Sequence, residues 1–362
     1  MSKVIAVLGG GHGAHTISAD LKHKGHNVRL YEMPQFRDNI NQLFATATIE
    51  VTGVTQFREK LDMVTDDIDA AVKDADYILV VTPAFAHTGY AKLLAGKLSK
   101  DQILISFPGG FAAMTFKKAF GDRNCPVLVD ANTLPYDTRI TAPCKVKLLG
   151  YNNLRLGFMP AENRAALNEK LKKDLFFDFG EPYSDVLECA LSNVNPCLHT
   201  GPCVLSVSAI ENATIDFFLY EHGFTPSAAK LNIALDNERK ALGRAFGYNI
   251  TCLEDFGNIP VGFTWQQLYM AGHGQIALTP INGPNDIFNR YLTEDAYCGL
   301  APWSDIAKQV GVETPVIDSV INIYNIIHEK DWRKEGYSAE KLGISGMTAG
   351  QIVEYIKGGE VK

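Results

Sequence analysis

The first sixteen residues contain the feature that most limits how this chain can fold. The apolar run "VIAVL" (4–8) leads directly into "GGGHGAHT" (9–16), which places Gly9, Gly11 and Ala14 in a G-x-G-x-x-A spacing. The first glycine allows a tight turn after a strand, the second lets a diphosphate approach the backbone, and the third small residue lets helix and strand pack closely. The pattern predicts a strand, a loop and a helix whose N-terminus binds a dinucleotide.

An acidic residue stands where the second strand of such a domain ends. The run "VRLYE" (28–32) ends in Glu32, nineteen residues after Gly13. A carboxylate at this place accepts hydrogen bonds from the ribose hydroxyls of adenosine and repels a 2′-phosphate. The sequence therefore favours NAD over NADP, although Arg37 could accommodate a 2′-phosphate. Within the loop, Gly13 and His12 are expected to contact the cofactor, and solvent is the alternative for His12.

Short strand-like runs alternate with helical patterns as far as about residue 130. This alternation predicts βαβ units and a parallel, doubly wound sheet of the Rossmann type. Loops that follow its strands (81–87 and 107–110) are expected to line the cofactor, and Pro83 in the first of them either contacts it or only ends a strand. Beyond residue 130, "TRIT", "CKVKLLG" and "LRLGFMP" predict antiparallel strands that extend the edge of the sheet.

A domain boundary is expected near "FGEPYSD" (179–185), where a glycine and a proline occur and strand signals largely end. Asp185 and Glu188 form a capping-box pattern that opens a helix, and Thr225 followed by proline opens another. We expect an NAD-binding domain over 1–183 and an all-α substrate domain over 184–362.

One histidine of the second half lies between two prolines. In "VNPCLHTGPCV" (194–204), a helical projection of residues 185–210 places leucines on one face and His199 on a neighbouring polar face. Pro196 and Pro202 predict a kink around it. On these residues alone, His199 is either a core residue of a kinked helix or a proton-exchanging group in a cleft.

Composition narrows the classes of partner. The chain has 362 residues and a net charge of −7 without a long run of either sign, which favours a small molecule over nucleic acid or an anionic membrane. We expect no secretory signal at the N-terminus and no membrane span, because no apolar run approaches about 20 residues. Seven scattered cysteines without a C-x-x-C pair predict reduced thiols in a cytoplasm and no metal site.

Four motifs together resemble the opine dehydrogenase family. They are the glycine loop, "NVNPCLHTGP" (193–202), "RYLTEDAYCGLAP" (290–302) and "DWRKEGYSAEKLGISGMT" (331–348). The resemblance implies a Rossmann domain joined to a helical domain. It also implies NAD(P)H-dependent reductive condensation of the α-amino group of an amino acid with a 2-oxo acid, usually pyruvate, in a homodimer.

The resemblance also implies roles for single residues. His199 is expected to act as general acid/base and Asp295 to hold its tautomer. Arg290 is expected on the cofactor pyrophosphate, with a substrate carboxylate as the alternative. Further substrate contacts are expected from Asn195 and Thr200. Arg139 is a weaker candidate for a substrate carboxylate, and a surface role on an edge strand is the equal alternative.

Two other functions stay open at this point. One is reduction of a 2-oxo acid or ketone on the same two-domain plan, and the other is a non-catalytic protein that senses the dinucleotide. The amino acid used is undetermined, because residues 212–226 and 251–274 do not align with the family.

Overall fold

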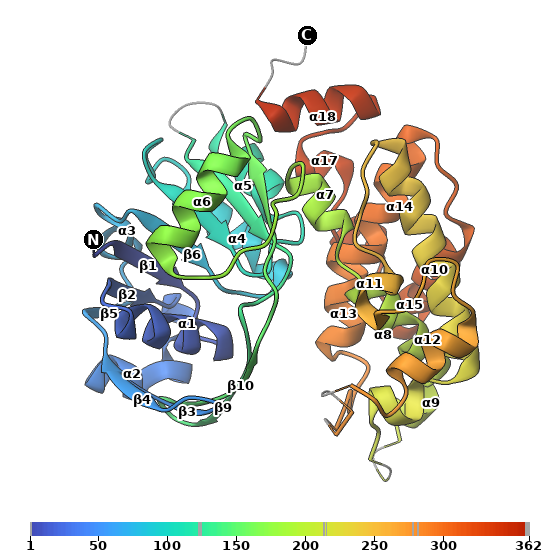
Figure 1. The fold of residues 1–362 in the computed structure, drawn as a ribbon, viewed down its shortest axis with the longest axis horizontal. Coiled ribbons are helices and arrows are strands. Elements are labelled where there is room, and N and C mark those ends of the chain that lie inside the picture. Colours follow the sequence, from blue (N-terminus) through green and yellow to red (C-terminus); the bar gives the residue numbers. More distant parts are fainter. Residues whose placement is uncertain are drawn as a thin grey trace. The chain divides into compact units, whose positions relative to one another are not determined.

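The computed structural model describes residues 2–121, 125–212, 214, 216–276, 279–280 and 282–358. The chain forms two compact units (Figure 1): one contains the described residues up to Ala190 together with those from Glu354 onward, and the other is Leu191–Val353. The division at Ala190 lies a few residues beyond the expected boundary at 183. Helix α7 (Val186–Leu191) stays largely with the first unit, since the Cys189 thiol donates a hydrogen bond to the carbonyl of Asp130.

The first unit contains a seven-stranded sheet in the order β11-β8-β7-β6-β1-β2-β5. All its neighbours pair in parallel except β11, which runs antiparallel to β8. The order reverses at β1, which pairs with β2 on one side and β6 on the other, as in a doubly wound sheet. The predicted Rossmann-type fold is confirmed. Its strands are β1 (Val4–Leu8), β2 (Asn27–Tyr31), β5 (Met63–Thr65), β6 (Tyr77–Val80), β7 (Ile103–Ser106), β8 (Val127–Ala131) and β11 (Leu156–Met159).

A second sheet of the first unit was missed from the sequence. Its order is β4-β3-β10-β9, formed by β3 (Thr48–Gly53), β4 (Phe57–Lys60), β9 (Tyr136–Ala142) and β10 (Lys145–Tyr151). The prediction that β9 and β10 extend the parallel sheet is wrong, and β11 alone does so. The reason is the parallel pairing of β10 with β3: at Gly53 a Cβ would lie 2.0 Å from the Leu148 carbonyl oxygen, so glycine permits the close approach.

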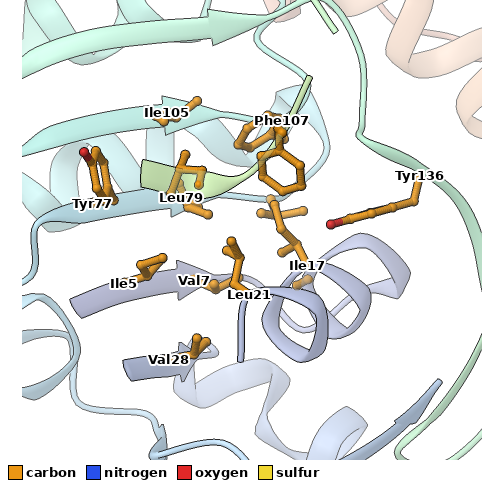
Figure 2. Packing of buried hydrophobic residues seen from close by; sticks show 14 of the residues in the cluster. Ile5, Val7, Ile17, Leu21, Val28, Tyr77, Leu79, Ile105, Phe107 and Tyr136 are labelled. Atoms are coloured by element: carbon orange, nitrogen blue, oxygen red, sulfur yellow. The ribbon is translucent and has the colours of Figure 1, made fainter. Parts of the chain in front are cut away.

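Helix α1 (His12–His23) packs against strands of both sheets (Figure 1). Figure 2 shows Ile17 and Leu21 of this helix among buried strand side chains, with Tyr136 of β9 beside Ile17. This packing fixes the start of α1 at the carboxyl end of β1. The other helices of the unit are η1 (Pro34–Ile40), α2 (Asn41–Thr46), α3 (Ile68–Val72), η2 (Ala84–Ala86), α4 (His87–Leu94), α5 (Ala112–Phe120) and α6 (Arg164–Leu175).

The second unit is helical, as predicted. Its elements are α8 (Asn195–Leu205), α9 (Val207–Ile210), η3 (Leu219–Gly223), α10 (Pro226–Ala245), α11 (Leu253–Gly257), α12 (Trp265–Gly272), α13 (Arg290–Asp295), η4 (Ala296–Leu300), α14 (Ala301–Val310), α15 (Pro315–His328), α16 (Trp332–Glu335), α17 (Ala339–Leu342) and most of α18 (Ala349–Lys357). No helix in the described ranges is long and apolar enough to cross a membrane.

Both predicted helix starts occur. Asp185 accepts a hydrogen bond from the Glu188 backbone N–H at 3.0 Å, while the Glu188 carboxylate accepts one from the Ser184 N–H at 2.5 Å. Thr225 caps α10 by accepting from the Ala228 N–H at 3.3 Å.

The continuous kinked helix expected over residues 185–210 does not form. The chain instead builds α7, α8 and α9 in succession, with a break after Leu191. Pro196 lies in the first turn of α8, where its missing N–H would have no intrahelical partner in any case, so it begins a helix and does not bend one. Pro202 alone lies inside α8. The position of His199 therefore depends on where α8 begins.

Candidate active site

His199 has a hydrogen-bond partner at each ring nitrogen. Its Nδ1 lies 2.7 Å from Oδ2 of Asp295, and its Nε2 lies 3.0 Å from the hydroxyl of Tyr220. All three side chains are buried. His199 thus lies in a buried polar site, although the helix on which its polar face was predicted is not continuous.

Asp295 reaches His199 because two helical segments approach closely. Asp295 ends α13 and is followed at once by the π-helical turn η4, which packs on α8. At Gly299 of η4 a Cβ would lie 2.3 Å from Cγ of Pro196, so this contact requires glycine. The structure brings together the pair that the family resemblance implied.

Tyr220 was not predicted as a site residue. It lies in the π-helical turn η3, a type of turn that often occurs at functional sites. Its backbone is held by residues more than fifty positions away, since the Leu219 N–H donates to the Gly283 carbonyl and the Gly274 N–H donates to the Tyr220 carbonyl. Burial raises the pKa of Tyr220 well above its ordinary value, so the phenol stays protonated at neutral pH.

The face of the imidazole is covered by a second tyrosine. The ring centroids of His199 and Tyr291 are 4.4 Å apart with a tilt of 38°. Beside it, the Arg290 guanidinium lies 5.3 Å from the Tyr291 ring centroid. The Arg290 side chain is 64% exposed and 3.9 Å from the Glu294 carboxylate, which is long for an ion pair, so it remains available to bind an anion.

This arrangement suits proton exchange at one nitrogen. Asp295 accepts a hydrogen bond from Nδ1–H, which fixes the tautomer and leaves the Nε2 lone pair to accept a proton. After protonation the nearby carboxylate stabilises the imidazolium. A buried His–Asp pair of this kind can act as general base and general acid in the same reaction cycle.

Three other residues predicted as substrate contacts differ in their exposure. Asn195 is exposed at the start of α8. Thr200 is fully buried, and its hydroxyl donates to the Pro196 carbonyl at 2.5 Å, which leaves no exposed group to meet a substrate. Arg139 lies on β9, an edge strand of the second sheet, and its guanidinium donates to the Thr138 carbonyl at 2.8 Å.

In the first unit, the glycine loop (9–13) forms a cradle that is exposed at Gly11 and His12. Gly9 has a φ of +118°, and a Cβ there would lie 2.6 Å from the Val81 carbonyl oxygen. At Gly11, the N-cap of α1, a Cβ would meet nothing within 4 Å, and no side chain caps the helix. The first N–H groups of α1 can therefore bind a diphosphate directly. Gly13 faces the protein interior, because a Cβ there would meet Leu134, and Ala14 is buried.

Glu32 lies beside this cradle. Its carboxylate is so close to Gly10 that a Cβ at that glycine would lie 2.5 Å from Oε2, and its Oε1 accepts a hydrogen bond from the Met33 N–H. Burial raises the pKa of Glu32. Arg37 is ion-paired with Asp66 and lies 4.3 Å from the Phe44 ring centroid. The acidic side chain, and not the arginine, is thus closest to the loop.

The two remaining residues predicted to contact the cofactor are His12 and Pro83. Nδ1 of His12 accepts a hydrogen bond from the Ile140 N–H at 2.7 Å, so this nitrogen binds the second sheet. Pro83 is exposed and directly precedes η2, which is compatible with either role expected of it.

Asp236, Cys252 and Glu254 gather possible metal-ligating atoms within 4.8 Å of one another. Two cations already neutralise the carboxylates, because Arg239 bonds Asp236 and Lys240 lies 2.6 Å from Glu254. We therefore interpret this cluster as a structural ion-pair network.

A Rossmann-type domain with a diphosphate cradle and a helical domain with a buried His–Asp pair define a dehydrogenase that uses a nicotinamide nucleotide. Residues 4–120 match the model of the NAD-dependent glycerol-3-phosphate dehydrogenase N-terminus, and residues 182–328 match that of the NAD/NADP octopine/nopaline dehydrogenase alpha-helical domain. An opine dehydrogenase of Arthrobacter sp. is 32% identical over 355 residues, which cover 97% of this chain and 98% of that protein. The chain belongs to the opine dehydrogenase family, whose members are NAD(P)-dependent oxidoreductases acting on CH–NH donors.

Other similar proteins also match this chain over nearly its whole length. A vitopine synthase of Allorhizobium ampelinum is 26% identical, over 99% of this chain and all of that protein. A solved structure of octopine dehydrogenase in complex with NADH and agmatine superposes with a TM-score of 0.78 at 20% identity and covers 98% of both chains, which supports the same fold. Both matching family models are of nicotinamide dinucleotide enzymes, one NAD-dependent and one NAD/NADP-dependent, and the preference for NAD over NADP stays a prediction.

Proposed function

We propose that this protein catalyses the NADH-dependent reductive condensation of the α-amine of an L-amino acid with a 2-oxo acid, most simply pyruvate. The observation that carries the proposal is the buried His199–Asp295 pair in a member of the opine dehydrogenase family. Solved octopine dehydrogenases described as complexes with pyruvate and with L-arginine support these two substrate classes.

The reaction requires proton movements that the pair can perform. The amine adds to the ketone, and loss of water from the adduct needs a proton on the departing hydroxyl. His199 supplies this proton, and Asp295 holds its ring and stabilises the imidazolium that precedes the step. When bound, NADH supplies the hydride that reduces the imine carbon. The glycine cradle and Glu32 orient this cofactor by its diphosphate and its adenosine ribose.

Three residues are assigned to the binding of the anionic groups. Arg290 binds the cofactor pyrophosphate, for which its exposed guanidinium is suited, or else a substrate carboxylate. Asn195 offers an exposed amide at the start of α8 for a substrate carboxylate. Arg139 is the weaker choice because its guanidinium is already bonded to its own strand.

A screen of NADH oxidation with pyruvate and each common amino acid tests the proposal, with mass spectrometry to detect the secondary amine. The expected result is oxidation that requires both substrates, with a product that contains both carbon skeletons. Oxidation with pyruvate alone would instead identify a 2-oxo acid or ketone reductase. Tight NADH binding without turnover for any pair, glyoxylate and oxaloacetate included, would identify a non-catalytic dinucleotide-binding protein.

We also propose a homodimer in a cytoplasm. All seven cysteines lie in the described part of the chain and none of them forms a disulfide there, which agrees with a reducing compartment. Light scattering after size-exclusion chromatography tests the dimer, for which a mass near 39.7 kDa would be the contrary result.

A further inference from the structure

The Tyr220 hydroxyl blocks direct access to the nitrogen that the proposed reaction uses. It lies 3.0 Å from Nε2 of His199, while Asp295 occupies Nδ1. Both ring nitrogens therefore have partners within the described residues. A substrate atom that exchanges a proton with Nε2 must either displace this hydroxyl or exchange the proton through it.

The surroundings of Tyr220 favour exchange through the hydroxyl. The two flanking backbone bonds, 3.1 Å from the Leu219 N–H to the Gly283 carbonyl and 3.2 Å from the Gly274 N–H to the Tyr220 carbonyl, fix the main chain. The side chain is 4% exposed, and its ring packs edge-on against His199 at a centroid distance of 6.3 Å. Displacement of the hydroxyl would require the ring to turn away from His199 at a buried position, which costs packing contacts.

The hydrogen-bond capacity of a phenol adds a second argument. Within the described residues, Nε2 of His199 is the hydrogen-bond partner found for the Tyr220 hydroxyl. While His199 is neutral, the phenol donates its single proton to Nε2. Once Nε2 carries a proton, the phenol oxygen must accept, and its own O–H becomes available to a substrate atom.

We propose that Tyr220 transfers protons between His199 and the substrate, an inference that rests on the proposed function. As the amine–ketone adduct loses its hydroxyl, the C–O bond breaks and the phenol proton forms the second O–H bond of the departing water. In the same step the Nε2–H bond breaks and that proton restores the Tyr220 hydroxyl. The imidazolium becomes neutral and the substrate becomes an iminium cation, so protons and charge balance.

Tyr220→Phe tests this role, because it keeps the ring and removes the hydroxyl. The relay predicts that kcat falls by about 10²-fold with an unchanged dissociation constant for NADH and an altered pH profile of kcat. It also predicts that the double variant with His199→Ala is no slower than His199→Ala alone, because the two residues act as a unit. The matched control is Tyr324→Phe, which removes another buried hydroxyl, one that donates to the Thr200 carbonyl, and should leave kcat nearly unchanged.

Two results would overturn the relay. One is a wild-type kcat in Tyr220→Phe, whether or not the KM for the 2-oxo acid falls. This result would mean that the substrate displaces the hydroxyl and that no proton passes through it. The other is a His199 15N NMR signal, assigned by its loss in His199→Ala, that titrates identically in Tyr220→Phe and wild type. Failure of the proposed function can be distinguished from failure of the relay, because the wild-type protein itself would then lack amine-dependent turnover.

Discussion

Nδ1 of His199 lies 2.7 Å from Oδ2 of Asp295, although the two residues are 96 positions apart in the chain. The contact depends on the approach of η4 to α8 at Gly299 and Pro196, and on the end of α13 at Asp295. It gives the imidazole one fixed tautomer and a nearby negative charge. The first prediction concerns what happens when either member of this pair is changed.

His199→Ala is expected to lower kcat by about 10²–10⁴ with little change in NADH affinity, because the imidazole and the glycine cradle lie in separate units. Asp295→Asn should cause a loss of the same order, because its amide can donate to Nδ1 and stabilise the wrong tautomer. Steady-state kinetics and NADH fluorescence titration measure the two effects. Glu294→Gln, next to Asp295, is the control, and near-normal kcat in His199→Ala would remove the pair from the mechanism.

A second prediction concerns the choice of cofactor. Glu32→Gln removes the negative charge beside Gly10 and keeps the size of the side chain. We expect the ratio of kcat/KM for NADPH to that for NADH to rise by about tenfold, equivalent to about 1.4 kcal/mol, because repulsion of the 2′-phosphate is lost. Glu59→Gln is the control, since this residue pairs with exposed His23. An unchanged ratio would show that Glu32 does not select the cofactor.

A third prediction concerns the buried ion pair of the helical unit. The Arg239 guanidinium is fully buried, donates to Asp236 and to the Leu191 carbonyl, and lies 2.8 Å from the Thr251 carbonyl. Arg239→Met removes these bonds and leaves Asp236 with Lys240 at 3.3 Å as its remaining cation. We expect the free energy of unfolding to fall by about 3 kcal/mol, the lower end for a broken buried pair.

Urea denaturation followed by far-UV circular dichroism measures this change. The control is Arg333→Met, which breaks a partly exposed pair with Asp318 and should cost about 1 kcal/mol or less. Equal losses in the two variants would contradict a special contribution from Arg239.

The parallel sheet and its glycine loop could be predicted because their signals are local. Each buried strand of a βαβ unit appears in the sequence as a short apolar run. The glycine loop appears as small residues at fixed spacings. Two strands of the second sheet, β9 and β10, were predicted, but the pairing that makes them part of a separate sheet gave no local signal. Strand β10 pairs with β3, 95 residues earlier, and both are partly exposed, so their alternation resembles that of the edge of any sheet.

The site could be predicted only in part. A helical projection identified His199 as polar but assumed one helix from 185 to 210, and the observed break after Leu191 lies outside what periodicity detects. The pairing of Asp295 with His199 came from the family resemblance, because the sequence alone cannot bring their two segments together. Tyr220 was missed because its place is set by bonds to Gly274 and Gly283, which leave no pattern in the neighbouring residues.

The last prediction concerns the pH dependence of stability. Asp130, at the end of β8, is fully buried, and burial raises its pKa to about 7. Its carboxyl group accepts a hydrogen bond from the Ala113 N–H at 3.1 Å. Since the folded-state pKa exceeds that of the unfolded chain, the folded state binds more protons between about pH 4 and pH 7. The contribution of Asp130 to stability is therefore greatest below pH 4 and is lost as the pH rises towards 7.

Asp130→Asn keeps an acceptor for the Ala113 N–H and cannot ionise. Relative to wild type, the variant should gain stability progressively from pH 4 to pH 7, by on the order of 4 kcal/mol at most. Urea denaturation at several pH values measures the difference, in which the contributions of all other groups cancel. Asp101→Asn, at an exposed position, should show no such trend. A difference between Asp130→Asn and wild type that stays constant across this range would mean that Asp130 does not titrate there, and that its burial is compensated by polar groups around the carboxylate.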